Sequence, residues 1–191
     1  MIIAVTNRSL CENNFIQRVR NLIDSGVYGV YLREKDLNQK DYETLALKIS
    51  EGSKKYLSRL ILCNPDSAKI IGVQNIQVSM EFVKNNEAPP VGLRTGVSVH
   101  SIDEAITAER WGADYITAGH IFVTNCKKDV PPRGLDFLKE ICRYVRIPVF
   151  AIGGINESNY QFVLDAGAAG FCLMSELMKC SKPETEIHKY K

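Results

Sequence analysis

The chain has 191 residues, with 24 lysines and arginines against 22 aspartates and glutamates, a formal net charge of +2 and 45% hydrophobic residues. This is an ordinary globular composition, and the length allows one complete core, so we expect a single domain over residues 1–191 with a polar tail from about residue 180. The sequence shows no basic face, nucleic-acid motif, membrane-length apolar run or signal peptide, which argues against nucleic-acid and membrane partners and predicts a cytoplasmic protein. Its six scattered cysteines form no C-x-x-C pair, so we expect most of them to be small buried apolar side chains.

Short β-branched runs alternate with helical patterns along the chain, which is typical of parallel β/α repeats. The predicted strands are Ile2–Thr6, Val27–Leu32, Leu60–Cys63, Asn75–Val78, Gly92–Ser98, Tyr115–Ala118, Pro148–Ile152 and Gly170–Leu173. The predicted helices are Phe15–Ser25, Gln39–Leu57, Asp66–Ile71, Met80–Asn85, Ser101–Trp111, Gly134–Tyr144, Glu157–Ala166 and one that starts at Ser175. Eight such units predict an α/β fold, a small (β/α)8 TIM barrel with short third, fourth and eighth helices; an open doubly wound sheet is the alternative.

Several helices have recognisable ends. Ser101 precedes Glu104 by three residues, which is the spacing of a capping box, and Asn156 stands before Glu157 as an N-cap. Glycines fall where helices must stop before the next strand, at Gly26, Gly112 and Gly167.

Polar residues follow the strands at the end where a barrel forms its active site. The candidates for substrate contact are Arg33, Lys35, Asn64, Gln77, Ser98, His100, Thr124 and Lys127. Arg33 and Lys35 alternate with Glu34, so one face of this segment directs two cations into the cleft. A solvated surface charge run is the alternative.

A glycine pair predicts a phosphate site. Gly153 and Gly154 follow the seventh strand, where backbone N–H groups approach a ligand without obstruction by Cβ. With the start of a helix near Ser175, this is the usual phosphate position of a barrel, after strands seven and eight. An ordinary tight turn is the alternative.

Two histidines are placed to act in the predicted cleft. His120 follows the sixth strand and precedes a loop with Thr124 and Lys127, and His100 follows the fifth. An imidazole takes and returns protons near neutral pH, so His120 is the candidate catalytic residue. A structural histidine is the alternative at both positions.

Seven segments carry a family resemblance. They are Tyr31–Asp36 (YLREKD), Ser98–Ser101 (SVHS), Gly112–Tyr115 (GADY), Gly119–Lys128 (GHIFVTNCKK), Arg133–Leu135 (RGL), Ile147–Ile155 (IPVFAIGGI) and Ala166–Gly170 (AGAAG). In this order they resemble the thiamin phosphate synthase superfamily along nearly the whole chain, which implies the barrel fold.

The synthase branch of that superfamily holds Mg²⁺ and a pyrophosphate with two aspartates. Pro65 and Phe82 stand at those positions here, and Asp66 is one residue out of register. Neither Pro65 nor Phe82 can supply the carboxylate oxygen that a hard cation needs. We therefore expect neither a metal nor another cofactor.

The segment Gly119–Lys128 is similar to the TenI-type thiazole tautomerase of thiamin biosynthesis, which implies a metal-independent isomerase that aromatises a carboxythiazole phosphate. In that reading His120 shuttles the proton, and Gly153, Gly154 and Ser175 hold the phosphate. Arg33, helped by Lys35 or Lys127, neutralises the carboxylate. The resemblance implies a phosphorylated thiazole as ligand, and the oligomeric state stays open. A thiamin phosphate synthase and a non-catalytic, TenI-like regulatory or ligand-binding protein are the alternatives.

Overall fold

A computed structural model describes residues 1–124 and 130–190 of the chain. The strands follow one another in chain order around a closed barrel, which confirms the predicted α/β barrel fold. They are β1 (Ile2–Val5), β2 (Gly29–Tyr31), β3 (Leu60–Leu62), β4 (Asn75–Ser79), β5 (Arg94–Val99), β6 (Tyr115–Gly119), β7 (Val149–Ile152) and β8 (Gly170–Leu173). The helices are η1 (Arg8–Leu10), α1 (Phe15–Asp24), α2 (Gln39–Ser50), α3 (Lys54–Arg59), α4 (Pro65–Ile71), α5 (Met80–Lys84), α6 (Ile102–Trp111), α7 (Gly134–Tyr144), α8 (Tyr160–Asp165), α9 (Ser175–Lys179) and α10 (Pro183–His188).

The described residues divide into two compact units. The amino-terminal unit is Ile2–Ile76 with the chain from Leu173 on, and the central unit is Gln77–Cys172 with Met1. Strand β4 begins in the first unit and ends in the second. That the whole chain forms one domain stays a prediction.

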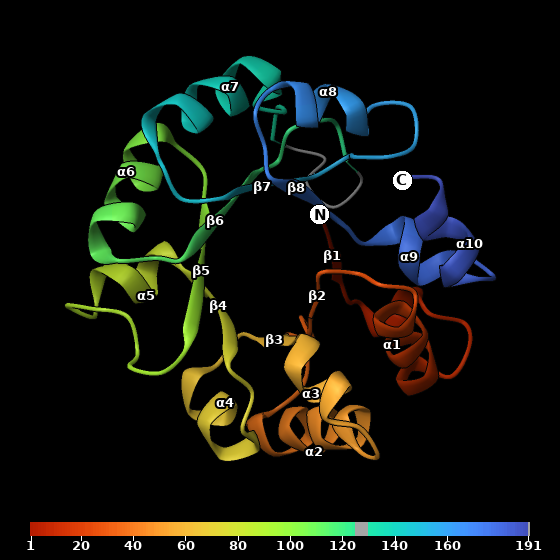
Figure 1. Ribbon diagram of the computed structural model, residues 1–191. Coiled ribbons are helices and arrows are strands. Elements are labelled where there is room, and N and C mark those ends of the chain that lie inside the picture. The colour runs from red at the N-terminus through yellow and green to blue at the C-terminus, as the bar shows by residue number, and fades with distance from the viewer. Residues whose placement is uncertain (125–129, 191) are drawn as a thin grey trace. The chain divides into compact units, whose positions relative to one another are not determined.

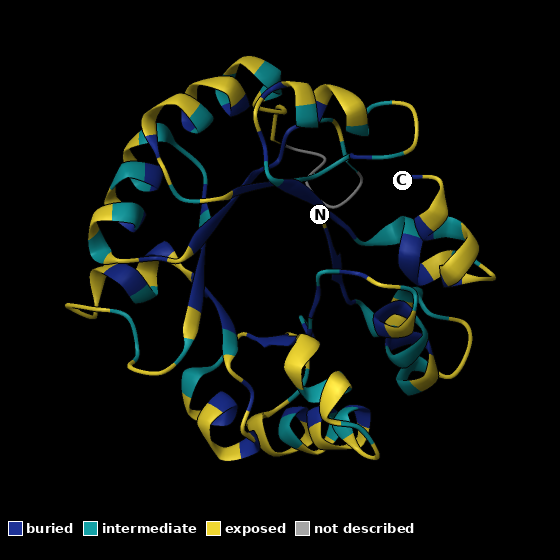
Figure 2. Cartoon of the chain, in the orientation of Figure 1, coloured by how far each residue is buried: buried dark blue, intermediate teal, exposed yellow. Residues whose placement is uncertain are grey.

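In the amino-terminal unit, buried parallel strands are covered by amphipathic helices. Val30 of β2 pairs with Leu60 of β3, and both side chains are fully buried. Helix α1 buries Val19, Leu22 and Ile23, whose spacing places them on one helical face. Most residues of these strands are dark blue in Figure 2, and Figure 1 shows α1 beside α10.

A buried arginine anchors the chain beyond β8 to α1. The Nη2 of Arg18 donates to the carbonyl oxygen of Cys180 at 2.5 Å, and its Nη1 donates to the Cys180 Sγ at 3.1 Å. Burial raises the pKa of the Cys180 thiol, while the Arg18 charge acts in the opposite direction. Arg18 is 5% exposed, so these bonds form away from solvent.

The predicted helix Gln39–Leu57 is two helices, α2 and α3. Gly52 lies between them with φ +87°, a left-handed conformation that ends a helix at low cost for glycine alone. Ser53 then caps α3, because its side chain accepts from the N–H of Lys55. The turn is exposed, and a Cβ on Gly52 would meet no atom within 4 Å.

The strands of the central unit are parallel and buried as well. Val97 of β5 pairs with Ile116 of β6, and Ala118 pairs with Ala151 of β7. Gly96 is required in β5, because a Cβ there would overlap the ring of Tyr115. Figure 1 shows α6, α7 and α8 along the outside of this sheet.

The predicted N-caps at Ser101 and Asn156 can be compared with the observed helix starts in the central unit. The Ser101 side chain accepts from the N–H of Glu104 at 3.1 Å, as predicted. The predicted N-cap at Asn156 is wrong, since α8 begins at Tyr160. Asn156 Oδ1 accepts from the N–H of Ser158 instead, forming a local turn that competes with the helix.

Most of the described cysteines are not buried. Cys63 is exposed, and Cys11, Cys142 and Cys180 are half-buried. Only Cys172 of the described cysteines is buried, where burial raises the pKa of its thiol to about 12. Cys126 lies outside the described residues. The expectation of mostly buried thiols is therefore wrong for the five described cysteines.

None of the helices in residues 1–124 and 130–190 combines the length and apolar character that crossing a bilayer requires.

Candidate functional site

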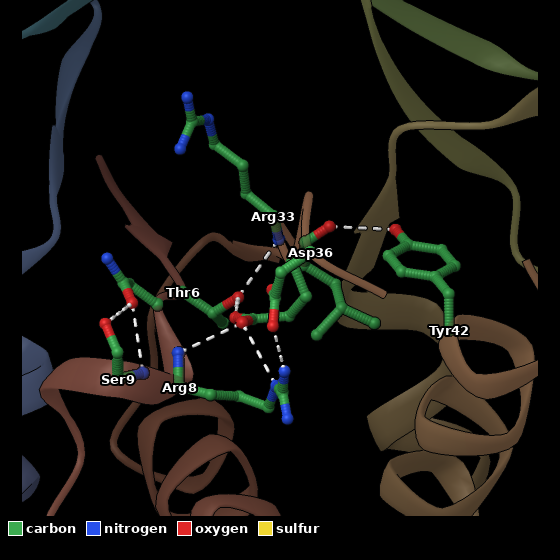
Figure 3. A network of polar contacts seen from close by, with 9 residues as sticks. Thr6, Arg8, Ser9, Arg33, Asp36 and Tyr42 are labelled. Atoms are coloured by element: carbon green, nitrogen blue, oxygen red, sulfur yellow. Dashed lines mark hydrogen bonds and ion pairs between the residues drawn. The ribbon is translucent and has the colours of Figure 1, made fainter. Parts of the chain in front are cut away.

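A buried carboxylate joins the ends of β1 and β2 in the amino-terminal unit. The Thr6 hydroxyl donates to Glu34 Oε1 at 2.6 Å, and the Arg8 backbone N–H donates to Oε2 at 3.0 Å. The Arg8 guanidinium also forms an ion pair with Glu34, with Nε 3.4 Å from Oε2. Arg8 Nη2 donates to Asp36 as well. Figure 3 shows this network, which the sequence reading missed because Glu34 sits inside a charge run that looked solvated.

Arg33 lies at the edge of this network without belonging to it through its side chain. Its backbone N–H donates to Thr6 Oγ1 at 3.0 Å, while its side chain points away from the other labelled residues in Figure 3. Among the described residues, its guanidinium makes no hydrogen bond or ion pair. Lys35 is exposed. That both cations meet a substrate stays a prediction.

Tyr42 of α2 ties the ends of β2 and β3 together. Its buried hydroxyl donates to the Leu32 carbonyl oxygen at 2.8 Å and accepts from the Cys63 N–H at 3.2 Å. Burial is the main reason why the pKa of Tyr42 is raised. The sequence alone does not indicate these two hydrogen bonds, because an aromatic residue on an amphipathic helix is expected to belong to the hydrophobic core.

Asn64 is occupied by helix capping. Its Oδ1 accepts from the N–H groups of Asp66 at 2.8 Å and Ser67 at 3.1 Å, and Pro65 is the first residue of α4. The Asp66 side chain is exposed. The amide oxygen of Asn64 thus serves the backbone, and substrate contact by this residue stays a prediction.

The second aspartate position of the synthase branch is also apolar. Phe82 packs edge-on against Trp111, with ring centroids 6.2 Å apart. Within the described ranges, no group of three or more His, Cys, Asp or Glu residues is arranged to hold a metal ion. These residues do not fit the Mg²⁺ of the synthase branch, which needs carboxylate oxygens.

His120 of the central unit is buried immediately after β6, with 4% of its surface exposed. Its Nε2 lies 3.1 Å from the Val130 carbonyl oxygen, and its own carbonyl accepts from the Arg133 N–H at 3.0 Å. Since a carbonyl oxygen only accepts, Nε2 carries the proton of that bond. The ring therefore links the end of β6 to residue 130, a contact that a structural histidine makes.

The glycines after β7 are required by packing. Gly153 has φ +102° and Gly154 has φ +69°. A Cβ on Gly153 would overlap the Cβ of His120, and one on Gly154 would overlap the carbonyl oxygen of Val123. This close approach gives a structural reason for both glycines beside the predicted phosphate role.

The hydrogen bonds of this turn use its carbonyls. The Gly153 oxygen accepts from the Phe122 N–H at 2.9 Å, and the Gly154 oxygen accepts from the Asn159 side chain at 2.9 Å. Among the described residues, none of the bonds holding the turn uses the N–H groups of the two glycines. Asn159 was missed by the sequence reading, which placed it inside a helix.

Two other predicted residues of the central unit are joined directly. Gln77 is buried on β4, and its Nε2 donates to Ser98 Oγ on β5 at 2.9 Å. His100 is half-buried, with its Nδ1 3.6 Å from Glu104 Oε2. Thr124 is half-buried beyond β6.

Two predicted residues remain, Ser175 and Lys127. Ser175 is half-buried at the start of the five-residue helix α9, in the amino-terminal unit. Lys127 lies outside the described residues. Phosphate binding by Ser175 and substrate binding by Lys127 stay predictions.

The family model described as thiamine monophosphate synthase matches residues 2–177. A protein named thiamine-phosphate synthase from Clostridium acetobutylicum is 36% identical over 93% of this chain and 87% of its own length. One of the same name from Pyrococcus abyssi is 33% identical over 97% of this chain and 91% of its own. The structure of the thiamine phosphate pyrophosphorylase from Pyrococcus furiosus has a TM-score of 0.82 and 27% identity, over 98% of this chain and 92% of that one.

These similarities contradict the predicted thiazole tautomerase. The relatives at 33–36% identity are named for the synthase, so the isomerase assignment is wrong. A catalytic role for His120 stays a prediction. The match over residues 2–177 and the relatives that span most of the chain place it in one family. The chain belongs to the thiamine monophosphate synthase family.

Proposed function

We propose that this chain is a thiamine-phosphate synthase, a transferase that joins a pyrimidine pyrophosphate to a thiazole phosphate. The observation that carries the proposal is the identity of 33–36% to proteins of that name over at least 93% of the chain. In this reaction the bond from the pyrimidine methylene carbon to the pyrophosphate oxygen breaks, and a bond from that carbon to the thiazole nitrogen forms. Pyrophosphate leaves with the electron pair of the broken bond.

The guanidinium of Arg33, which pairs with none of the described residues, supports a role in binding the pyrophosphate. A planar guanidinium binds phosphate oxygens through two parallel N–H donors, and it keeps its charge at any pH in the working range. In the amino-terminal unit, Arg8 is already engaged by Glu34 and Asp36. Arg33 therefore has its donors available for an anion.

The turn at Gly153 and Gly154 supports a role in binding a phosphate group. Within residues 1–124 and 130–190, the bonds that hold the turn do not use its two glycine N–H groups, and neither residue has a side chain. Backbone N–H groups in such a turn make a concave site for anions. We assign the phosphate of the thiazole substrate to this turn.

The experiment is a synthase assay on the purified protein with both substrates. Thiamine phosphate is detected by oxidation to its fluorescent thiochrome derivative, and released pyrophosphate is counted in the same samples. We expect equal amounts of the two products, a loss of at least about tenfold in kcat/KM for Arg33→Met, and no change for Thr44→Val on the exposed face of α2. A wild-type protein that forms neither product would overturn the proposal.

The absence of the two carboxylates favours a second candidate function, a phosphate-binding protein without catalysis. Pro65 and Phe82 remove the family's metal ligands but leave Arg33 and the glycine turn in place. Such a protein would bind the thiazole phosphate, measured by calorimetry, without product formation in the assay above. Turnover rejects this candidate.

A further inference from the structure

We propose that Thr6 and Glu34 are positioning residues for Arg33, which they hold at the end of β2 with its guanidinium available for an anion. The inference rests on the proposed function, in which that anion is the substrate's pyrophosphate. It concerns residues of the amino-terminal unit only.

The direction of the hydrogen bonds is fixed by Glu34. The Thr6 hydroxyl has one proton, and the carboxylate that pairs with Arg8 can only accept it. The proton is therefore committed to Glu34 Oε1 at 2.6 Å, which leaves a lone pair on Thr6 Oγ1 to accept the Arg33 N–H at 3.0 Å. Thr6 is fully buried, so water does not compete for this lone pair.

The neighbouring peptide group is fixed as well. The Leu32 N–H donates to the Ile61 carbonyl oxygen at 3.0 Å, and the Leu32 carbonyl accepts from Tyr42. With the bond from Arg33 to Thr6, two successive residues have their backbone tied to buried partners. The Cα of Arg33 thus has a defined position, and its side chain starts from a rigid point.

Arg8 pairs with the carboxylates near Arg33, so that they do not pair with the Arg33 guanidinium. It pairs with both Glu34 and Asp36, the two carboxylates that flank Lys35 in the sequence. A buried carboxylate without its partner would attract the nearest free cation and neutralise it. Because Arg8 already pairs with both carboxylates, the charge of Arg33 stays available to bind an anion.

The test measures binding of inorganic pyrophosphate by calorimetry, so that it does not depend on turnover. Thr6→Val keeps the shape of the side chain and removes the hydroxyl, and we expect it to weaken binding about five- to tenfold, the value of one hydrogen bond. Thr6→Ser restores the oxygen and should bind within about threefold of wild type. Thr44→Val is the matched control, because the Thr44 hydroxyl donates to the Lys40 carbonyl on the exposed face of α2, and pyrophosphate binding by this variant should not change.

A double-mutant cycle separates positioning from a structural effect. If Thr6 acts through Arg33, Thr6→Val should have no further effect on pyrophosphate binding when Arg33 is already Met. An equal loss in the Arg33→Met background, or full binding by Thr6→Val, would overturn the inference. So would a wild-type protein that does not bind pyrophosphate, since Arg33 would then have no anion to receive.

A measurement on the wild-type protein covers the case in which Thr6→Val does not fold. The Arg33 amide hydrogen should exchange slowly in the free protein, and exchange at the rate of an unprotected amide would refute the bond to Thr6. The two proposals also fail separately. A protein that shows the expected pyrophosphate binding but makes no thiamine phosphate refutes the synthase and leaves the positioning of Arg33 intact.

Discussion

The two glycines after β7 are held in conformations that only glycine adopts at low cost. Both have positive φ, and both face backbone or Cβ atoms of residues 120–123. An alanine there meets two separate penalties, one from its own backbone conformation and one from overlap with its neighbours. The two penalties can be separated by comparison with another glycine of the same unit.

Gly154→Ala should lower the free energy of unfolding by at least about 2 kcal/mol, because backbone strain and overlap with Val123 act together. Gly92→Ala is the control, since Gly92 has φ +79° but no atom within 4 Å of its Cβ position. It should cost only about 1 kcal/mol. Urea unfolding followed by circular dichroism gives both values. Equal losses in the two variants would show that the packing of the turn against residues 120–123 contributes nothing.

The positions of individual site residues along the chain could be predicted from the sequence, but their hydrogen-bond and ion-pair partners could not. The sequence placed Arg33 and the glycine pair after strands, which the structure confirms. It could not show that Glu34 is buried, because a carboxylate between two cations looks solvated until the partner from another strand is known. It likewise could not show the contact of His120 with Val130, which lies ten residues further along the chain.

At the scale of elements, the contact between α1 and the chain beyond β8 depends on one buried arginine. Arg18 satisfies the Cys180 carbonyl and contacts its sulfur, and no other described residue is seen to pair with its guanidinium. A charged donor in such a position is costly to remove, because the carbonyl keeps its need for a partner.

Arg18→Met retains most of the apolar stem and removes the donors, so we expect it to lower the free energy of unfolding by about 2 kcal/mol. Arg110→Met is the control on an exposed face of α6 and should stay within about 0.5 kcal/mol of wild type. Denaturant titration at equilibrium measures both. A change at Arg18 no larger than that at Arg110 would contradict the anchor.

The order of strands and helices could be predicted, because the spacing of apolar residues differs between buried strands and amphipathic helices. Element ends depended on local competition. Gly52 stops α2 by its backbone conformation, and Asn156 bonds to its own turn instead of capping a helix. Both outcomes depend on φ values and side-chain bonds that periodicity does not report.

At the scale of the whole molecule, the two compact units are discontinuous in sequence, and two strands, β4 and β8, have residues in both. Each unit therefore contains only part of the parallel strands. A unit with an incomplete sheet has few means of folding by itself, so we expect the chain to behave as the single domain predicted from its length.

Urea unfolding should therefore show one transition. Trp111, the only tryptophan, reports on the central unit through its fluorescence, while circular dichroism reports on helices in both units. The two curves should coincide, with the same midpoint and slope. A fluorescence midpoint that differs from the dichroism midpoint would mean that the units unfold separately.

The prediction of a thiazole tautomerase was wrong, and the reason lies at the scale of the whole chain. The ten residues Gly119–Lys128 resemble the tautomerase, whereas the order of motifs along the chain resembles the superfamily as a whole. The relatives named for the synthase match over nearly the full length, and a comparison of full length averages over every strand end. The similarity of one loop concerns only a small part of the chain.

The glycine turn between α2 and α3 gives the molecule a place to carry added chain. A short peptide inserted between Gly52 and Ser53 would keep both the glycine that ends α2 and the serine that caps α3, at a turn where a Cβ on Gly52 would meet nothing within 4 Å. Exposed turns of this kind accept insertions because few buried groups depend on them. An epitope or a fluorophore attachment sequence could thus be displayed there, providing a handle for labelling and immobilisation that leaves the carboxyl ends of the strands untouched.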